Sequence, residues 1–489
     1  MKRRYKVPAN REQQNLFPDS LADYVGADNP VRAIDAYVDS LDLSLLNFEK
    51  ADGRLTRGQP CYDPSSLLKL YLYGYIYKVR SSRCLEREAH RNVEVMWLLG
   101  KLQPSYKTLS DFRKNNAKAL KAANKDFVLL CKELELFGGE VIGIDGSFFN
   151  GNASKGSIYT QEKLDKQLRK LDKKIAEYQQ QLSDQDDSDD DSGLGSLVED
   201  PALSEKLERL KEKQAEKQAL SEQMKATKQS QISTTDKDAR LLRKRGQVTA
   251  GFNVQIAVDD KYKLIIGNQV SNDGNDSQQL SRMAIDAKTT LEVEELIAVA
   301  DAGYYERDQL KHCEEAQITA YVAIPAVRDL GRYARDAFEY DEAQNAYICP
   351  QGERLNQKGK PRIKENKTQY FYASQTTVCA QCPQRDNCLA ENASKRTLYR
   401  WEHEATIERH KARMKNGQEW MKRRSALAEH PFGTLKRRAG WDHFLVRGLK
   451  KVSGELSLMT LCYNFTRVIN ILGVEELRKY CEQRQAVAA

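Results

Sequence analysis

Two aspartates stand where short apolar runs meet polar or glycine residues. Asp145 lies within EVIGIDGSFFN, and Asp301 follows ELIAVA. Both runs are typical of buried strands. A carboxylate there is costly unless it is paired, and two carboxylates side by side repel unless cations neutralise them. The pair therefore favours a site for hard divalent ions such as Mg²⁺, in which two ions about 4 Å apart can support phosphoryl transfer. Taken singly, Asp145 would be a turn residue and Asp301 a helix N-cap.

A third acid is expected on a later basic helix. The segment RRSALAEHPFGTLKRRAGW carries Glu429, followed by Phe432 and Lys436 on the same helical face. Because proline is tolerated only in a first helical turn, Pro431 predicts that the helix starts or bends near Glu429. Glu429 could complete a metal site and Lys436 could hold phosphate. The alternative is an exposed ion pair on a basic helix. Further candidate phosphate-binding residues are Arg424, Arg437 and Arg438.

Glu455 is the competing acid. It precedes LSLMTLCYNFTRVINIL, an apolar helix that we expect to pack against the sheet. In that setting Glu455 would pair with Arg447 or cap the helix near Gly454. The sequence therefore favours Glu429 as the acid of the site.

The elements that would position these acids alternate in a recognisable order. After the first strand, GQVTAGFNVQIAVDDKYKLIIGNQVSN reads as two strands joined by a turn at Asp259-Asp260. A helix, the Asp301 strand, a second helix and the strand TAYVAIP follow. Three strands followed by alternating helix and strand predict an α/β fold of RNase H-like order, interrupted by insertions.

Two insertions and an amino-terminal helical domain surround this core. Residues 1–138 read as helices, with Asp63-Pro64 and Ser110 as helix starts and Gly138-Gly139 as a stop. The domain is either a bundle with a solvated basic face or a DNA-end-binding domain. Residues 139–470 would be the catalytic domain, and 471–489 a carboxyl-terminal tail.

The segment from 160 to 230 predicts an antiparallel helical hairpin with an acidic tip, SDQDDSDDDSGLGSLVED. Apolar residues recur at heptad spacing along both of its arms. They are Leu164, Leu168, Leu171, Ile175, Tyr178 and Leu182, then Leu203, Leu207 and Leu210. We interpret the hairpin as a spacer, with contact to a second subunit as the alternative.

A cysteine-rich insertion is expected at 345–395. Cys349, Cys379, Cys382 and Cys388 cluster there, whereas the other six of the ten cysteines lie singly. Four thiolates suit a closed structural Zn²⁺ site, with plain reduced cysteines as the alternative.

The composition is otherwise that of a soluble protein of several domains, with 489 residues and a net charge of +8. A mild basic excess is compatible with nucleic acid but weak evidence alone. Because no apolar run approaches a membrane span and the amino terminus is polar, we expect a cytoplasmic, nucleoid-associated protein without membrane contact.

Taken in order along the chain, seven segments resemble bacterial insertion-sequence transposases of the DDE type, over nearly the full length. These are YDPSSLLKLYLYGYIYKVRSSRCLE, IGIDGSFFNGNASK, GFNVQIAVD, AVADAGYYE, CPQG with CAQCPQRDNC, EHPFGTLKRRAG and LVRGLKKVSGELSLMTLCYNFTRV. The resemblance is closest to the group with an amino-terminal helical domain, a helical insertion and a cysteine-rich insertion.

The resemblance implies that Asp145, Asp301 and Glu429 bind two metal ions, either Mg²⁺ or Mn²⁺. It also implies that the enzyme frees a 3′-hydroxyl at the element's end and joins it to target DNA. Relatives carry a Tyr, Arg, Glu, Lys motif. Here Lys436 matches its lysine, but Ser425 stands at the arginine position and Lys422 at the tyrosine position. The implied partners are double-stranded DNA, as element ends and target, and further copies of this chain. The alternatives are a nuclease without strand transfer and a non-catalytic DNA-binding protein.

Overall fold

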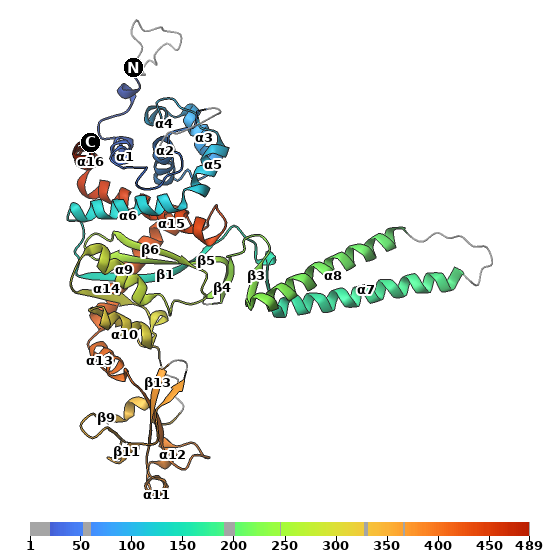
Figure 1. The fold of residues 1–489 in the computed structure, drawn as a ribbon, viewed down its shortest axis with the longest axis vertical. Helices are drawn as coiled ribbons and strands as arrows, with labels where there is room; N and C mark the ends of the chain where they lie inside the picture. Colours follow the sequence, from blue (N-terminus) through green and yellow to red (C-terminus); the bar gives the residue numbers. More distant parts are fainter. Residues whose placement is uncertain are drawn as a thin grey trace, which may run out of the picture.

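The computed structural model describes residues 20–51, 60–189, 201–244, 246–326, 331–364 and 367–488. It has a helical part, a central sheet, a projecting helical hairpin and a second, smaller sheet (Figure 1). The tip of the acidic linker, residues 190–200, lies outside the described residues. Among the described helices, none is both long and apolar enough to cross a bilayer.

The central sheet joins strands from distant parts of the chain. Its strands are β1 (Val141–Asn150), β4 (Arg240–Lys244), β5 (Gln247–Asp259), β6 (Ile265–Ser271), β7 (Leu296–Ala300) and β8 (Ile318–Val322). The spatial order is β4-β5-β1-β7-β8, with β6 also paired to β5. Strands β1, β5 and β6 form an antiparallel meander, and β7 and β8 continue from β1 in parallel. The expected succession of three strands, helix, strand, helix and strand agrees with these elements, and β4 is an additional short strand.

Helices cover both faces of this sheet, as the consecutive buried residues 141–144 of β1 require. On one side lie α9 (Leu280–Leu291) and α10 (Arg307–Glu315), and α14 (Gln418–Gly433) packs across β1 and β7. Leu427 on α14 is fully buried against Gly143, where a Cβ atom would lie only 2.8 Å from the Leu427 Cβ. Glycine at this position therefore allows α14 to approach the sheet closely. Helix α13 (Glu404–Lys415) contacts α10 and β8.

The helical part contains the amino-terminal helices and the carboxyl terminus together. It comprises η1 (Leu21–Tyr24), α1 (Pro30–Asp39), α2 (Pro64–Ile76), α3 (Ser82–Arg91), α4 (Val93–Leu98), α5 (Tyr106–Asn115), α6 (Ala117–Glu133), α15 (Leu449–Leu472) and α16 (Val474–Ala488). Helix α15 packs on α6 and on β6, so it lies between the other helices and the sheet (Figure 1). The segment expected as a tail is thus helix α16, which packs on α1.

Of the two helix starts predicted in this part, one is an N-cap and the other is not. Asp63 caps α2 as expected, because its side chain accepts a hydrogen bond from the Ser65 amide. Ser110 is not an N-cap and lies inside α5. The N-cap is Ser105, whose hydroxyl accepts from the Thr108 amide and so pairs one of the open amides of the first turn.

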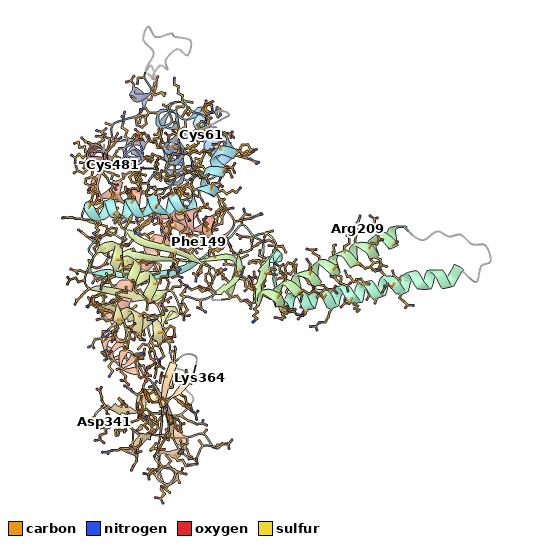
Figure 2. The ribbon with its side chains drawn as sticks, viewed as in Figure 1. Cys61, Phe149, Arg209, Asp341, Lys364 and Cys481 are labelled. Carbon is orange, nitrogen blue, oxygen red and sulfur yellow. The ribbon has the colours of Figure 1, made fainter. Side chains whose placement is uncertain are left out.

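The helical hairpin consists of α7 (Gln161–Asp189) and α8 (Pro201–Thr227), rooted in the paired strands β2 (Ile158–Thr160) and β3 (Gln231–Ser233). Leu164, Ile175 and Leu207 of the expected seam are buried, whereas the side chains of Leu182 and Leu203 lie outside the described residues. Figure 2 shows Arg209 on the projecting hairpin and Phe149 in the central body.

The second sheet surrounds the cysteine cluster. It contains β9 (Glu339–Asp341), β10 (Ala346–Ile348), β11 (Arg354–Gln357), β12 (Arg362–Lys364), β13 (Lys367–Ala373) and β14 (Thr397–Trp401), with the short helices η5 (Arg335–Ala337), α11 (Thr376–Ala380) and α12 (Arg385–Cys388). This unit extends beyond the expected 345–395, because β9 and β14 lie outside that range. The cysteines had indicated the expected range, and these two strands carry none. Asp341 and Lys364 mark it in Figure 2.

Candidate active site

Asp145 and Asp301 stand at the same level of neighbouring parallel strands. The register of β1 and β7 pairs Gly143 with Val299, and each aspartate lies two residues further on. Neighbouring strands are about 4.8 Å apart, so the two carboxylates are adjacent. Asp145 lies inside β1, and Asp301 directly follows β7. The sequence indicated that each aspartate ends or interrupts a buried strand, and Asp145 interrupts β1 whereas Asp301 follows the end of β7.

The electrostatics of the pair are those of a cation site. Burial raises the pKa of Asp145 to about 6, and the charge of Asp301 adds to this rise. The Gly146 amide, which donates to the Asp145 carboxylate at 2.8 Å, and the cations Lys244 and Arg424 offset only part of it. The Asp145 charge thus remains under-compensated beside a second carboxylate, which fits the oxygen donor set that a divalent ion requires.

Asp301 also performs the structural task considered for it from the sequence. Its side chain accepts from the Gly303 amide at 2.8 Å and so caps the short helix η4 (Ala302–Tyr304). A capping carboxylate keeps further lone pairs free, so the cap and metal binding are compatible.

Glu429 lies on α14, the helix that crosses the two aspartate strands, but outside the pair. Its carboxylate is exposed and accepts a hydrogen bond of 2.8 Å from Ser425, the residue at the arginine position of the family motif. Within the described part of the chain, no group of three or more His, Cys, Asp or Glu side chains is gathered closely enough to hold a metal ion. The structure therefore brings together Asp145 and Asp301 but not Glu429.

Of the two alternatives predicted around Glu429, a helix start is wrong, and an irregular turn lies close by instead. Helix α14 begins at Gln418, so Pro431 lies near its end and not in its first turn. The helix continues as a π-helical turn, η6 (Thr434–Arg438). Proline removes an amide donor and pushes against the preceding turn, which is a physical reason for the backbone to widen here.

Lys436 lies next to Asp145 on the same face of β1. Its ammonium group donates to the Ser147 hydroxyl at 2.6 Å and to the Phe148 carbonyl, and lies 4.5 Å from the centre of the Phe149 ring. Burial lowers the pKa of Lys436 to about 8. One of its three N–H donors remains for a ligand. Arg437 and Arg438, on the same turn, are exposed.

Glu455 has a different environment from the one expected. It is fully buried and accepts hydrogen bonds from Tyr75 at 2.9 Å, from Arg80 at 3.1 Å and from the Leu445 and Val446 amides. The expected pairing with Arg447 is wrong, because Arg447 contacts Asn152 and the Glu455 carboxylate points into the helical part. Glu455 thus ties α15 to the amino-terminal helices.

Asp276 is an acid near the pair that sequence reasoning missed. It is 6% exposed and accepts hydrogen bonds of 2.7 Å from both Asn253 and Gln255 on β5. Its segment, SNDGNDSQQL, has the polar composition of an ordinary loop. Only its burial, which the sequence does not show, distinguishes Asp276 from a loop residue.

The four clustered cysteines line one small cavity of about 30 Å³ in the second sheet. Burial raises the pKa of the Cys388 thiol, and the three neighbouring thiols add to this effect. All ten cysteines are free of disulfides. The donor set suits Zn²⁺, although the thiols are not gathered in ligand geometry among the described residues.

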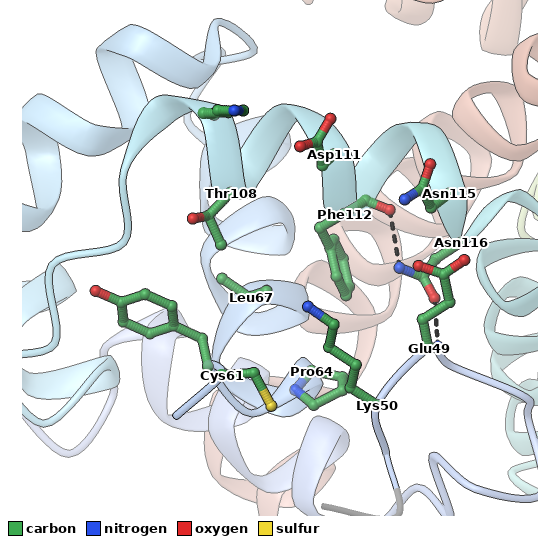
Figure 3. A pocket seen from close by; sticks show the side chains of 12 residues that line it. Glu49, Lys50, Cys61, Pro64, Leu67, Thr108, Asp111, Phe112, Asn115 and Asn116 are labelled. Carbon is green, nitrogen blue, oxygen red and sulfur yellow. Dashed lines mark hydrogen bonds between the residues drawn. The ribbon is translucent and has the colours of Figure 1, made fainter. Parts of the chain in front are cut away.

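A further pocket, of about 240 Å³, lies in the helical part (Figure 3). Asn116 organises one wall, because it donates to the Phe112 carbonyl and accepts from the Glu49 amide. None of the strands that carry the aspartates lines this pocket, so it is separate from the site.

A basic cleft of about 460 Å³ lies between α3 and the loop that follows η6. Its basic lining residues are Lys78, Arg80, Arg87 and Arg91 on one side and His443 on the other. Glu88 is the acidic residue in the lining. The loop is joined to β1, since the Asn150 amide donates to the Asp442 carbonyl and the Phe444 amide donates to the Asn150 carbonyl, each at 2.9 Å.

Comparisons with known proteins bear on these observations. Residues 19–115 match the family model described as Transposase domain (DUF772), and residues 230–465 match Transposase DDE domain. Together the two matches cover more than half of the chain. The second includes Asp301 and Glu429 and begins after Asp145. Among curated proteins, no match was found. A solved structure, a piggyBac transposase synaptic complex with hairpin DNA, aligns with 94% of this chain and 80% of its own at 8% identity, with a TM-score of 0.32.

Proposed function

We propose, from the premise that the chain belongs to the DDE transposases of insertion sequences, that it cleaves the DNA ends of its element and joins the freed 3′-hydroxyl to target DNA. The observation that carries the proposal is the adjacent pair Asp145 and Asp301 on neighbouring parallel strands. The strand order β6-β5-β1-β7-β8, with antiparallel pairing before β1 and parallel pairing after it, supports an RNase H-like core.

Asp145 and Asp301 would hold the divalent ions, Mg²⁺ or Mn²⁺, and Glu429 would join them as the third ligand. Such ions activate the attacking oxygen and stabilise the leaving oxygen in phosphoryl transfer. Lys436, fixed against β1, would orient the scissile phosphate with its remaining donor. Arg424, whose charge already acts on Asp145, would neutralise a neighbouring phosphate.

The basic cleft is the surface that we assign to the DNA backbone beside the cleavage site. Five residues of β1 separate Asp145 from Asn150, to which the cleft loop is bonded, and at about 3.3 Å per residue this is about 17 Å. One DNA strand advances about 3.4 Å per nucleotide. A duplex held at the aspartates and lying along β1 would therefore meet the cleft about five nucleotides away.

The test is Mg²⁺-dependent cleavage of DNA that carries the element's ends, identified from inverted repeats beside the gene. Asp145→Asn and Asp301→Asn are expected to abolish cleavage and to retain DNA binding, since affinity comes mainly from phosphate contacts by Lys and Arg. Asp286→Asn, an exposed change on α9, is the matched control. A variant of either aspartate that still cuts would remove that residue from the site.

Product analysis separates the alternatives. Joined products indicate a transposase, and cleavage without joining indicates a nuclease of the same fold. Binding without cleavage by the unaltered protein would favour a non-catalytic DNA-binding protein.

A further inference from the structure

Asp276 occupies the loop between β6 and α9, on the side of the sheet opposite the Asp145 carboxylate. Successive side chains of a strand point to opposite faces, so Asp145 and Gly146 face different sides. A Cβ atom on Gly146 would lie 2.7 Å from Asp276 Oδ1 and 2.3 Å from Gln255 Nε2. The Asp276 carboxylate is therefore packed directly behind the backbone of the first aspartate.

The same carboxylate also approaches the second aspartate. A Cβ atom on Gly303 would lie 3.0 Å from Asp301 Oδ1 and 3.6 Å from Asp276 Oδ2. Gly146 and Gly303 follow the two aspartates by one and two residues. Gly146 is thus explained by the space that the Asp276 and Gln255 side chains occupy, whereas a Cβ atom on Gly303 would meet the Asp301 carboxylate first.

A closed set of hydrogen bonds joins these parts. Gln255 donates to Asp276 at 2.7 Å and to Asn253 at 3.0 Å. Its carbonyl oxygen accepts from the hydroxyl of Tyr304, which lies three residues after Asp301 and is fully buried. Lys244, whose charge also acts on Asp145, lies 3.6 Å from Asp276 Oδ2 and donates to the Gly146 carbonyl at 3.3 Å.

We propose that Asp276 is a positioning residue that holds the segments after Asp145 and Asp301 at the separation that a divalent ion requires. It acts through Gln255, which connects the β1–β5 pair with Tyr304, and through Lys244, which bonds the Gly146 carbonyl. The inference rests on the proposed function, since it concerns the same carboxylate pair. Residues that orient metal ligands from behind typically change metal affinity or activity 10- to 100-fold when altered.

The experiment compares Asp276→Asn with wild type and with Asp145→Asn in the full chain. Mn²⁺ binding is measured by electron paramagnetic resonance without DNA, DNA cleavage is measured with Mg²⁺, and thermal unfolding is measured in parallel. Asn can still accept from Asn253 and Gln255 but loses the charge facing Lys244. We expect an unfolding midpoint near that of wild type, with Mn²⁺ binding weakened about 10- to 100-fold and cleavage slowed in parallel. Asp273→Asn, an exposed change in the same loop, is expected to match wild type in all three.

Two outcomes with Asp276→Asn would overturn the proposal. Mn²⁺ binding and cleavage like those of wild type would mean that Asp276 positions nothing. Loss of Mn²⁺ binding as complete as in Asp145→Asn would make Asp276 a ligand. If Asp276→Asn does not fold, Gly146→Ala decides, because its Cβ atom would displace the Asp276 and Gln255 side chains without removing a charge. Wild-type Mn²⁺ binding in that variant would refute the inference. Weakened Mn²⁺ binding in the variants, with no cleavage by wild type, would leave the inference standing and refute the proposed function.

Discussion

Arg80 and Glu455, 375 residues apart in the chain, form a buried ion pair with 3.1 Å between Arg80 Nη2 and Glu455 Oε1. Arg113 lies 3.9 Å from the same carboxylate oxygen. Two cations from the helical part thus converge on one acid of α15. This arrangement separates the roles of the two carboxyl-terminal glutamates, because Glu455 is enclosed by protein whereas Glu429 is exposed on α14.

Removing the Glu455 charge is expected to destabilise the protein. Glu455→Gln leaves Arg80 and Arg113 buried without their counter-charge, and breaking a buried pair in this way costs about 3–5 kcal/mol. Glu429→Gln should change the free energy of unfolding little and abolish cleavage. Chemical denaturation and a cleavage assay on both variants check this. A stable, inactive Glu455→Gln together with an active Glu429→Gln would reverse the assignment and remove the role of Lys436.

The sequence was sufficient to predict the strands that carry Asp145 and Asp301, because local apolar runs indicate them. It was not sufficient for Glu455, whose side-chain partners Tyr75, Arg80 and Arg113 are more than 340 positions away. Nor was it sufficient for Asp276, which looks like a loop residue until its burial is known. The π-helical turn was not predicted either, although Pro431, which precedes it, is a local cause of the widened backbone. The catalytic roles of Asp145, Asp301 and Glu429 stay predictions.

Zinc should be bound by the cavity that Cys349, Cys379, Cys382 and Cys388 line. We expect one Zn²⁺ per chain by elemental analysis, since four thiolates form a closed structural site. Cys379→Ser with Cys382→Ser, or chelation, should lower the unfolding temperature first and activity second, because metal binding contributes folding free energy. Cys84→Ser, a half-exposed cysteine on α3, is the control. Purified protein without zinc would show that the four are simply reduced thiols.

The helical hairpin should be dispensable for cleavage of a single DNA end. Thr160 and Gln231 are paired neighbours at its root, so a two-residue turn such as Asn-Gly can replace residues 161–230 and keep the β2–β3 pairing. The shortened protein is expected to fold and to nick DNA. Native gel analysis of complexes on paired ends then tests subunit contact. Normal nicking without paired-end assembly would make the hairpin an interface, and failure to fold would make it part of the core.

The basic cleft should contribute phosphate contacts, and α3 offers a matched pair of arginines to test it. Arg83 and Arg87 are both exposed and one turn apart, but only Arg87 lines the cleft, whereas Arg83 lies 5.3 Å from the centre of the Tyr106 ring. Each lost phosphate contact lowers the slope of log affinity against log salt concentration by about 0.9. We expect Arg87→Gln to weaken DNA binding with such a change in slope, and Arg83→Gln to do neither.

Interference mapping of backbone contacts should lose a signal about five nucleotides from the cleavage site in Arg87→Gln alone. This spacing follows from the length of β1 between Asp145 and Asn150. Equal effects of the two substitutions would indicate diffuse attraction by α3, and an unchanged slope for Arg87→Gln would remove DNA from the cleft.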